Sequence, residues 1–251
     1  MRFLITILVV CLQLAAAAQE FNKTDAQGRK QGVWKKYHEN GNLRYTGTFK
    51  DDQPVGMFTY YYDTGELQVE MKNTGKTAYS TVYYKTGEVQ AKGKYITQQK
   101  DSTWTYYDID GNKRAIETYS MGKKDKKWET YFPDGTLAEE KVWKDDFENG
   151  LWKQYFPNGK TKVIATYENG GLEGKAAYFR PDGTRGVSGN FYHGVRDGVW
   201  KYYEEDGQTV QKTEIYKNGQ RVDKNKDEHV EDMNSEQPIP EDEIFDGMGP
   251  R

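Results

Sequence analysis

Aromatic residues and glycines recur along the chain at an almost constant interval, with charged residues between them. In each unit an aromatic run is followed by a glycine, and the intervals between successive glycines are 24, 22, 24, 24, 24, 24 and 24 residues. An aromatic residue stands four positions before every one of them. A fixed period of this length predicts a repeat protein in which neighbouring units share one core. The glycines are Gly41, Gly65, Gly87, Gly111, Gly135, Gly159, Gly183 and Gly207.

Each unit has the pattern of a β-hairpin. The runs on both sides of the glycine are rich in Tyr, Trp, Phe, Val and Thr, which favour strands, and no helical apolar period follows residue 18. Asn or Asp precedes most of the glycines, as in Pro157-Asn158-Gly159. Proline fits the first corner of a type I turn and glycine the left-handed position after it, so we expect a three-residue loop. Gly219 lies beyond the last complete hairpin, and we expect it to be free of this requirement.

The register of the hairpin decides which aromatic residues face the core. With a three-residue loop and no bulge, Tyr155 opposes Thr161 and shares a face with Val163, Ala165 and Tyr167. We therefore predict that this face forms the main core. A second ladder, seven positions before the turn glycine, then lies on the other face, either as a second core layer or as a binding stripe for a partner. Its members are Trp34, Phe58, Trp104, Trp128, Trp152 and Trp200.

The unit Gly-x-Trp-x-x-Tyr-x-x-x-Gly resembles the MORN repeat variant, and the resemblance covers about residues 30–219. Close matches are Gly32-Val33-Trp34-Lys35-Lys36-Tyr37, Gly150-Leu151-Trp152-Lys153-Gln154-Tyr155 and Gly198-Val199-Trp200-Lys201-Tyr202-Tyr203. The third unit departs most, with Ala78 and Ser80 at the glycine and tryptophan positions, and the seventh has Ala176 for tryptophan. The resemblance implies an all-β fold, an elongated antiparallel sheet of about eight tandem hairpins with roughly 16 strands, which serves as a scaffold or binding platform. Some bacterial members of the family are labelled antitoxins of the YwqK type.

The two ends of the chain differ from the repeats. Arg2, the apolar run Phe3–Leu14 and the small residues Ala15–Ala18 have the layout of a Sec signal peptide cleaved after Ala18. The apolar run is too short to span a bilayer, and we expect no transmembrane span in the mature chain. Residues 222–251 hold ten acidic and three basic residues, a net charge of −7, and few large apolar ones. We therefore divide the chain into a signal peptide (1–18), an N-terminal lead-in (19–29), a repeat array (30–221) and an acidic disordered tail (222–251).

Composition and spacing argue against catalytic chemistry. The only cysteine, Cys11, lies inside the signal peptide, so a thiol nucleophile and a cysteine-ligated metal are excluded from the mature chain. The three histidines have no metal-ligand spacing. Carboxylate pairs such as Asp51-Asp52 and Asp145-Asp146 recur at corresponding connections, whereas a catalytic pair would occur once. We therefore predict no catalytic residue, no cofactor, no metal site and no enzymatic activity.

Charge and export narrow the kinds of partner. The whole chain carries −3, so removal of the −7 tail and of Arg2 leaves the repeat region at +3, too little for a nucleic-acid surface. We expect a non-catalytic scaffold that binds a protein or an envelope glycan in the periplasm, at the cell surface or outside the cell. An antitoxin or immunity protein that blocks one toxin, and a glycan-binding module, are the alternatives. The sequence names no partner and no oligomeric state.

Overall fold

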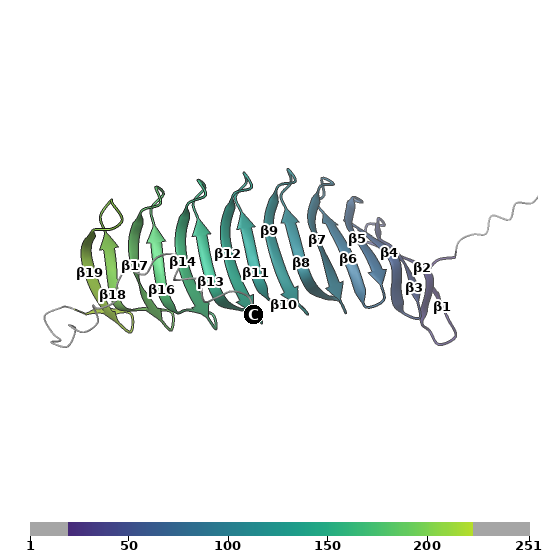
Figure 1. Cartoon of the computed structure of the whole chain (residues 1–251). Helices are drawn as coiled ribbons and strands as arrows, with labels where there is room; N and C mark the ends of the chain where they lie inside the picture. Colours follow the sequence, from purple (N-terminus) through teal and green to yellow (C-terminus); the bar gives the residue numbers. More distant parts are fainter. Residues whose placement is uncertain (1–19, 223–251) are drawn as a thin grey trace, which may run out of the picture. The chain divides into compact units, whose positions relative to one another are not determined.

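The regular structure in the described part of the protein is entirely β. The computed structural model describes residues 20–222, and these form two compact units, one ending at Gly75 and the other beginning at Lys76. The predicted signal peptide and residues 223–251 of the predicted tail lie outside the described residues. No helix among the described residues is long and apolar enough to cross a membrane. The prediction of an all-β, antiparallel hairpin fold is confirmed (Figure 1).

In each unit the chain runs back and forth between neighbouring antiparallel strands. The first unit contains β1 (Lys23–Thr24), β2 (Lys30–Tyr37), β3 (Leu43–Lys50), β4 (Gln53–Tyr61) and β5 (Leu67–Thr74). The second contains β6 (Thr77–Tyr83), β7 (Val89–Ile96), β8 (Gln99–Tyr107), β9 (Lys113–Ser120), β10 (Lys123–Lys124), β11 (Lys126–Tyr131), β12 (Leu137–Lys144), β13 (Phe147–Tyr155), β14 (Thr161–Glu168), β15 (Gly171–Leu172), β16 (Gly174–Phe179), β17 (Arg185–Tyr192), β18 (Val195–Tyr203), β19 (Val210–Lys217) and β20 (Gln220–Val222). Within each unit every hairpin therefore packs directly beside the next.

The predicted hairpins account for most of these strands. The eight hairpins are β2–β3, β4–β5, β6–β7, β8–β9, β11–β12, β13–β14, β16–β17 and β18–β19. The short strands β10 and β15 continue into β11 and β16 after one-residue breaks at Asp125 and Glu173, and β1 and β20 flank the repeats. The described strands exceed the expected 16 for this reason alone.

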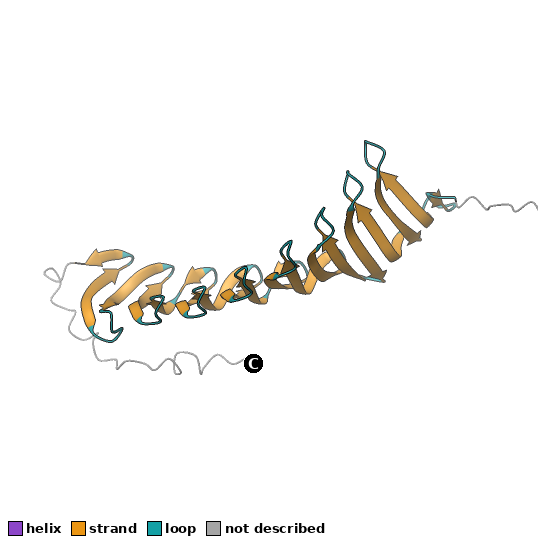
Figure 2. Ribbon diagram, turned by 90° about the horizontal axis from the view of Figure 1, so that it is seen from above, coloured by secondary structure: helices purple, strands orange, loops and turns teal. Residues whose placement is uncertain are grey.

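Seven of the eight hairpin tips have the predicted three-residue geometry, and the eighth is one residue longer, because the Glu204 amide donates to the Thr209 carbonyl at 2.8 Å. In the hairpin β13–β14, the Gly159 amide donates to the Phe156 carbonyl at 2.9 Å, and the Phe156 amide donates to the Lys160 carbonyl at 2.8 Å. Gly159 has a φ of +79°, the left-handed conformation that side chains disfavour. All eight turn glycines have a φ between +70° and +105°. Figure 2 shows these tips as loops at the ends of the strand pairs.

Gly159→Val is expected to lower the free energy of unfolding by about 1–3 kcal/mol. A Cβ at Gly159 would meet no atom within 4 Å, so backbone strain alone causes the loss. Gly159→Asn is the matched control, because asparagine adopts left-handed conformations more readily than other residues with a side chain. Chemical denaturation of both variants measures the difference. Equal losses for valine and asparagine would contradict the assigned conformation.

The connections between hairpins are two-residue turns. Asp51 and Asp52 have φ values of +51° and +64°, and Asp145 and Asp146 have +51° and +74°. Positive φ at both central residues is typical of the tight turns that suit twisted antiparallel strands. Gly219 occupies such a turn between β19 and β20 with a φ of +81°. The expectation that Gly219 is free of a turn requirement is therefore wrong, because the connection is itself a tight turn.

The predicted register is correct at the tip of the hairpin and wrong beyond it. Tyr155 pairs with Thr161 as predicted, but Gln154 pairs with Val163, which leaves Lys162 as an extra residue. Such a β-bulge moves all the following side chains to the other face of the strand pair. The same register shift follows the turn in all eight hairpins.

The bulge exchanges the two aromatic ladders. Trp152 pairs with Ala165, and its ring centroid lies 5.5 Å from that of Tyr167. Tyr155 lies on the opposite face, where its hydroxyl donates to Glu140 Oε1 at 2.5 Å. The prediction that the Tyr155 face is the main core is therefore wrong. The tryptophan ladder shares its face with the small apolar residues, and we call this side of each unit the aromatic face.

A large aromatic ring on one hairpin packs against a small residue on the neighbouring strand of the preceding hairpin. An added Cβ would lie closer than 3.0 Å to the next hairpin's ring at three glycines: Gly47 beside Phe58, Gly93 beside Trp104 and Gly189 beside Trp200. The seventh hairpin carries Ala176 at the tryptophan position, and it packs with Val163 and Ala165 in a buried cluster. Close packing of this kind lets a ring fill the space that a missing side chain leaves.

Hydrogen bonds join neighbouring hairpins at both ends of their strands. At the tips, Asn158 Nδ2 donates to the Pro181 carbonyl at 2.7 Å. At the connections, the Lys124 amide donates to Asp146 Oδ1 at 2.7 Å, and the Asp146 amide donates to the Lys124 carbonyl at 3.0 Å. Lys30 and Asp52 form the same pair of bonds in the first unit. The recurring aspartates therefore hold connections in place, as their periodic spacing predicts.

Candidate functional site

The predicted aromatic stripe lies in the interior of the aromatic face. Phe58, Trp104 and Trp200 are 3%, 1% and 0% exposed, and Trp34, Trp128 and Trp152 are half-buried. The indole N–H of Trp104 donates to the Lys94 carbonyl at 3.1 Å, and that of Trp200 donates to the Asn190 carbonyl at 3.1 Å. These contacts are typical of a core layer, which is the alternative that the sequence left open. A binding role for the ladder stays a prediction.

In the second unit, cations on the aromatic face have partners within the protein. Lys100 Nζ lies 4.7 Å from the ring centroid of Trp104 and donates to the Tyr106 hydroxyl at 2.7 Å. Burial lowers the pKa of Lys100, although the charge of Glu117 opposes this effect. The Tyr119 hydroxyl donates to Glu117 Oε2 at 2.7 Å. Positive charge here is balanced by a carboxylate and by aromatic rings.

A second network at the end of the array is also balanced internally. Glu214 accepts hydrogen bonds from the hydroxyls of Tyr202 at 2.6 Å and Tyr216 at 2.9 Å and from Lys212 at 3.2 Å. These hydrogen bonds lower the pKa of Glu214 to about 2. Arg196 donates to the same two hydroxyls at 3.1 and 3.2 Å. The three charges of this cluster therefore already have partners.

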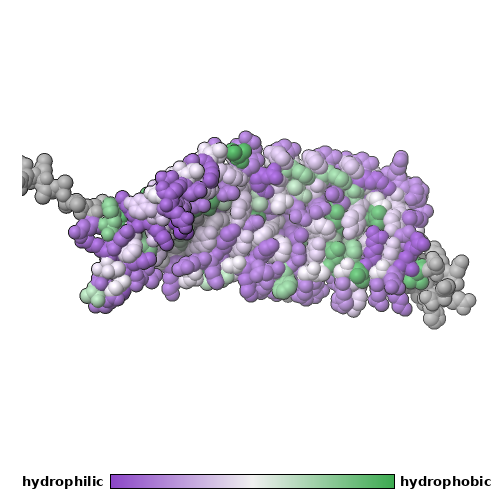
Figure 3. All heavy atoms as spheres, turned by 180° about the vertical axis from the view of Figure 1, so that it is seen from behind, coloured by the Kyte–Doolittle hydropathy of each residue, from purple (hydrophilic) through white to green (hydrophobic). Residues whose placement is uncertain are grey.

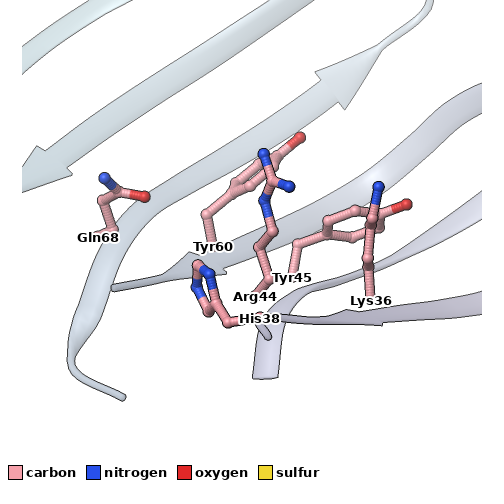
Figure 4. Close-up of a pocket in the computed structure, with 6 residues that line it drawn as sticks. All are labelled: Lys36, His38, Arg44, Tyr45, Tyr60 and Gln68. Atoms are coloured by element: carbon pink, nitrogen blue, oxygen red, sulfur yellow. The ribbon is translucent and has the colours of Figure 1, made fainter. Parts of the chain in front are cut away.

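The first unit contains a cavity with a different composition. Its volume is about 480 Å³, within the usual range for small-molecule sites. It lies over β2–β5 toward the hairpin tips, and Figure 4 shows its side chains extending from the same side of these strands. Its lining residues are Lys36, His38, Arg44, Tyr45, Tyr60 and Gln68. Two permanent cations line the cavity, and no carboxylate does.

The register explains why these residues meet. Lys36 pairs with Tyr45, and Tyr45 pairs with Tyr60, so the three side chains form a row across β2, β3 and β4. Arg44 and Gln68 are the extra residues of the β-bulges in the first and second hairpins. A bulge re-aims the extra side chain. Both side chains therefore reach the face that carries the row, although strict alternation would turn them away.

The polar groups of this cavity have few partners in the protein. His38 Nε2 lies 3.0 Å from the Tyr61 carbonyl, so this nitrogen carries a hydrogen and donates. Among residues 20–222, Lys36 and Arg44 take part in no ion pair, and no residue bonds to the Tyr45 and Tyr60 hydroxyls or the Gln68 amide. Their donors are therefore available to a ligand.

Two tyrosine rings form part of the cavity wall. The ring centroids of Tyr45 and Tyr60 are 5.7 Å apart with an interplanar angle of 45°. Burial raises the pKa of Tyr60, and neighbouring Tyr45 adds to the effect, so the Tyr60 hydroxyl keeps its proton at neutral pH. A neutral hydroxyl can donate to an acceptor in the cavity.

The sequence did not reveal this cavity. Five of its six lining residues come from four strands, and Arg44 and Gln68 reach it only through bulges, which no local pattern predicts. One cue was present: in the first hairpin a cation directly precedes an aromatic residue on each strand, as Lys36-Tyr37 and Arg44-Tyr45. No group of His, Cys, Asp or Glu in the described part of the chain could hold a metal ion.

Comparison with known proteins identifies the repeat. Four segments match the MORN repeat variant, at residues 30–51, 124–145, 148–169 and 196–220. No curated protein matches the chain. The four segments coincide with hairpin strands and connections in both units.

Two similar solved structures share only limited segments with the chain. One is a variant of S. aureus TarM in complex with fondaparinux, alpha-GlcNAc-glycerol and UDP, at 9% identity and a TM-score of 0.29, covering 38% of this chain and 19% of that one. The other is TarM, at 9% identity and a TM-score of 0.28, covering 39% of this chain and 20% of that one. The chain thus spans about a fifth of the length of either structure.

The 24-residue period, the bulged hairpins and the four matched segments agree on one assignment. The Gly-x-Trp-x-x-Tyr unit builds the first strand of the first, sixth and eighth hairpins, and the other hairpins carry variants of it. The turn glycine closes every hairpin. The protein contains MORN-variant repeats, four of which match the family directly.

Proposed function

We propose that the protein is a non-catalytic binding scaffold of the cell envelope or the extracellular space. The observation that carries this proposal is the contrast between a repeated framework and a varied surface. Turn glycines, bulges and interhairpin hydrogen bonds recur in matching places, whereas neighbouring positions on the same face differ in chemistry. Repeat arrays of this kind create extended surfaces on which few positions need to be alike.

Two sets of positions show the variation. Five residues before each turn glycine stand Lys36, Tyr60, Val82, Tyr106, Thr130, Gln154, Tyr178 and Tyr202. The bulge positions hold Arg44, Gln68, Gln90, Arg114, Ala138, Lys162, Gly186 and Gln211. Figure 3 shows one face covered mostly by hydrophilic side chains, with hydrophobic ones in separate small groups. A surface with this mixture suits binding to a specific partner better than nonspecific association.

The family supports the absence of catalysis. MORN repeats are generally non-catalytic binding repeats. The described carboxylates that recur in the sequence hold turns and connections, as Asp52 and Asp146 do. We therefore assign the chain a binding role and expect no turnover of a substrate.

Site-specific photo-cross-linking in cells tests the scaffold. A cross-linking residue is placed at exposed side chains of both units, Met57, Tyr79, Phe147 and Tyr192, which are 50–59% exposed. We expect a small set of covalent products from neighbouring positions, and none without irradiation. A captured toxin would favour the antitoxin alternative, and captured peptidoglycan or polysaccharide would favour the glycan-binding alternative. The absence of any product from an exported, folded chain would refute the scaffold.

Export has its own test. We expect the mature protein to begin at Gln19, because small residues at Ala15–Ala18 follow an apolar run. The intact mass of the protein recovered from the envelope or the medium decides the matter. A retained Met1 would refute cleavage, and a lipid mass on Cys11 would show a lipoprotein instead.

A further inference from the structure

We propose that the cavity over β2–β5 binds a small ligand through an oxyanion, that is a carboxylate, a sulfate or a phosphate. This inference deepens the proposed binding role, on which it rests for its biological meaning, by naming the chemistry of one site. The cavity is formed entirely by residues of the first unit.

Charge is the first argument. Lys36 and Arg44 line the cavity, their side chains are exposed, and neither has an ion-pair partner among residues 20–222. An arginine guanidinium can bind an oxyanion with two parallel hydrogen bonds, and a lysine adds a point charge. An unpaired cation pair in a concave site raises the local concentration of anions.

Neutral donors are the second argument. The hydroxyls of Tyr45 and Tyr60 and the amide of Gln68 line the same cavity without hydrogen-bond partners among the described residues. His38 Nε2 donates to the Tyr61 carbonyl, so Nδ1 of the neutral ring is an acceptor and does not belong to these donors. An oxyanion has several lone pairs and accepts from donors of this kind.

The second unit provides an internal comparison. There, Glu117 and Glu214 supply the negative charge that faces Lys100 and Arg196 on the aromatic face, through the tyrosine hydroxyls between them. In the first unit, Lys36 and Arg44 stand at other repeat positions, those of Tyr106 and Arg114, and the cavity that they line contains no carboxylate. An anion bound in this cavity would therefore meet two cations and no competing carboxylate of the lining.

Size and wall chemistry limit the ligand. A volume of about 480 Å³ accommodates a body as large as a monosaccharide, and the two tyrosine rings, inclined by 45° to each other, provide an apolar wall. Four probes share one sugar ring and differ in the group at its sixth carbon: glucose, glucuronate, glucose 6-sulfate and glucose 6-phosphate. Comparison of their affinities separates the effect of the charge from that of the ring. Inorganic phosphate and sulfate test whether the oxyanion alone suffices.

Isothermal titration of the whole purified chain tests the site. We expect saturable binding of at least one charged sugar and at least tenfold weaker binding of glucose. The double variant Lys36→Gln/Arg44→Gln should weaken the charged sugar about tenfold or more, since it removes two charge-assisted contacts. Tyr60→Phe should weaken it several-fold through one lost hydroxyl. Unchanged thermal unfolding of both variants shows that the fold is intact.

A charge-matched control separates a site from general attraction. Arg114→Gln/Lys217→Gln removes two exposed cations of the second unit, and Arg114 occupies the same bulge position in its hairpin as Arg44 does. This variant should bind as the unchanged chain does. Equal weakening by both double variants, or no saturable binding of any charged probe, would overturn the site. Binding of a charged probe in the titration without any cross-linked partner in cells would support the oxyanion site and refute the scaffold. A cross-linked partner without binding of any charged probe would support the scaffold and refute the oxyanion site.

Discussion

Trp200→Ala is expected to lower the free energy of unfolding by about 3–5 kcal/mol, the usual loss on emptying a buried large aromatic site. Trp200 is 0% exposed and contacts rings on three sides, with centroid distances of 5.1 Å to Phe191, 6.3 Å to Tyr178 and 6.3 Å to Tyr216. The Arg196 guanidinium lies 4.2 Å from its ring centroid. Removal of the indole therefore leaves a cavity between two neighbouring hairpins.

Trp152→Ala is the matched control on the same ladder. Trp152 is only half-buried, and it pairs with Ala165 on one side and with Lys141 on the other. Trp152 buries less apolar area on folding than Trp200 does, so the expected loss of unfolding free energy for Trp152→Ala is about 2 kcal/mol. Chemical denaturation gives the overall loss, and hydrogen exchange locates it in the hairpin. A loss below 1 kcal/mol for Trp200→Ala, with partner binding weakened, would show that the ladder is a binding stripe after all.

The repeat, the tips and the all-β class could be predicted from the sequence because each depends on local chemistry. An Asn-Gly or Asp-Gly turn needs the left-handed conformation wherever it occurs, and Gly159 adopts it with a φ of +79°. A 24-residue period also requires neighbouring units to share contacts, as Lys124 and Asp146 do. Turn geometry is therefore visible in a single repeat, and the period is visible as soon as two repeats are compared.

The faces could not be predicted because they depend on one extra residue. Without a bulge, Trp152 would oppose Ile164, on the face that also carries Lys162 and Thr166. The bulge at Lys162 instead places Trp152 beside Ala165. A conflict was nevertheless visible in the sequence, since the tryptophan position and the small residues after the turn both needed an apolar environment. A single apolar face satisfies both only if the register shifts by one residue.

The cavity was out of reach for the same reason. Arg44 and Gln68 line it because they are bulge residues, and no local pattern distinguishes them from ordinary strand residues. The row of Lys36, Tyr45 and Tyr60 depends on pairings across two hairpins. The local sequence specifies the turns and strands, whereas the set of side chains that meet on the surface depends on the register between neighbouring strands.

Gly189→Val is expected to lower the free energy of unfolding by about 3 kcal/mol or more, at the upper end of the range for overpacked cores. Gly189 does not have a positive φ, so a larger residue faces no backbone strain there. An added Cβ would instead lie closer than 3.0 Å to the ring of Trp200. Gly186→Val in the same strand β17 is the control, because its Cβ would make only ordinary contacts, the nearest at 3.5 Å to the Tyr178 carbonyl oxygen. Its loss should stay below about 1 kcal/mol.

A double-mutant cycle shows whether glycine and tryptophan act as one packing unit. Gly189→Ala alone should cost about 1–3 kcal/mol by overpacking, and Trp200→Ala alone about 3–5 kcal/mol. The double variant recreates the pair that the chain already uses at Ala165 and Ala176, which are 1% and 4% exposed. In the absence of the indole, the new methyl group fills part of the cavity, so the double variant should lose at least about 1 kcal/mol less than the sum of the single losses. Strictly additive losses in denaturation would mean that the ring does not rest on the glycine, and the size matching between neighbouring hairpins would then fail as the rule that orders this core.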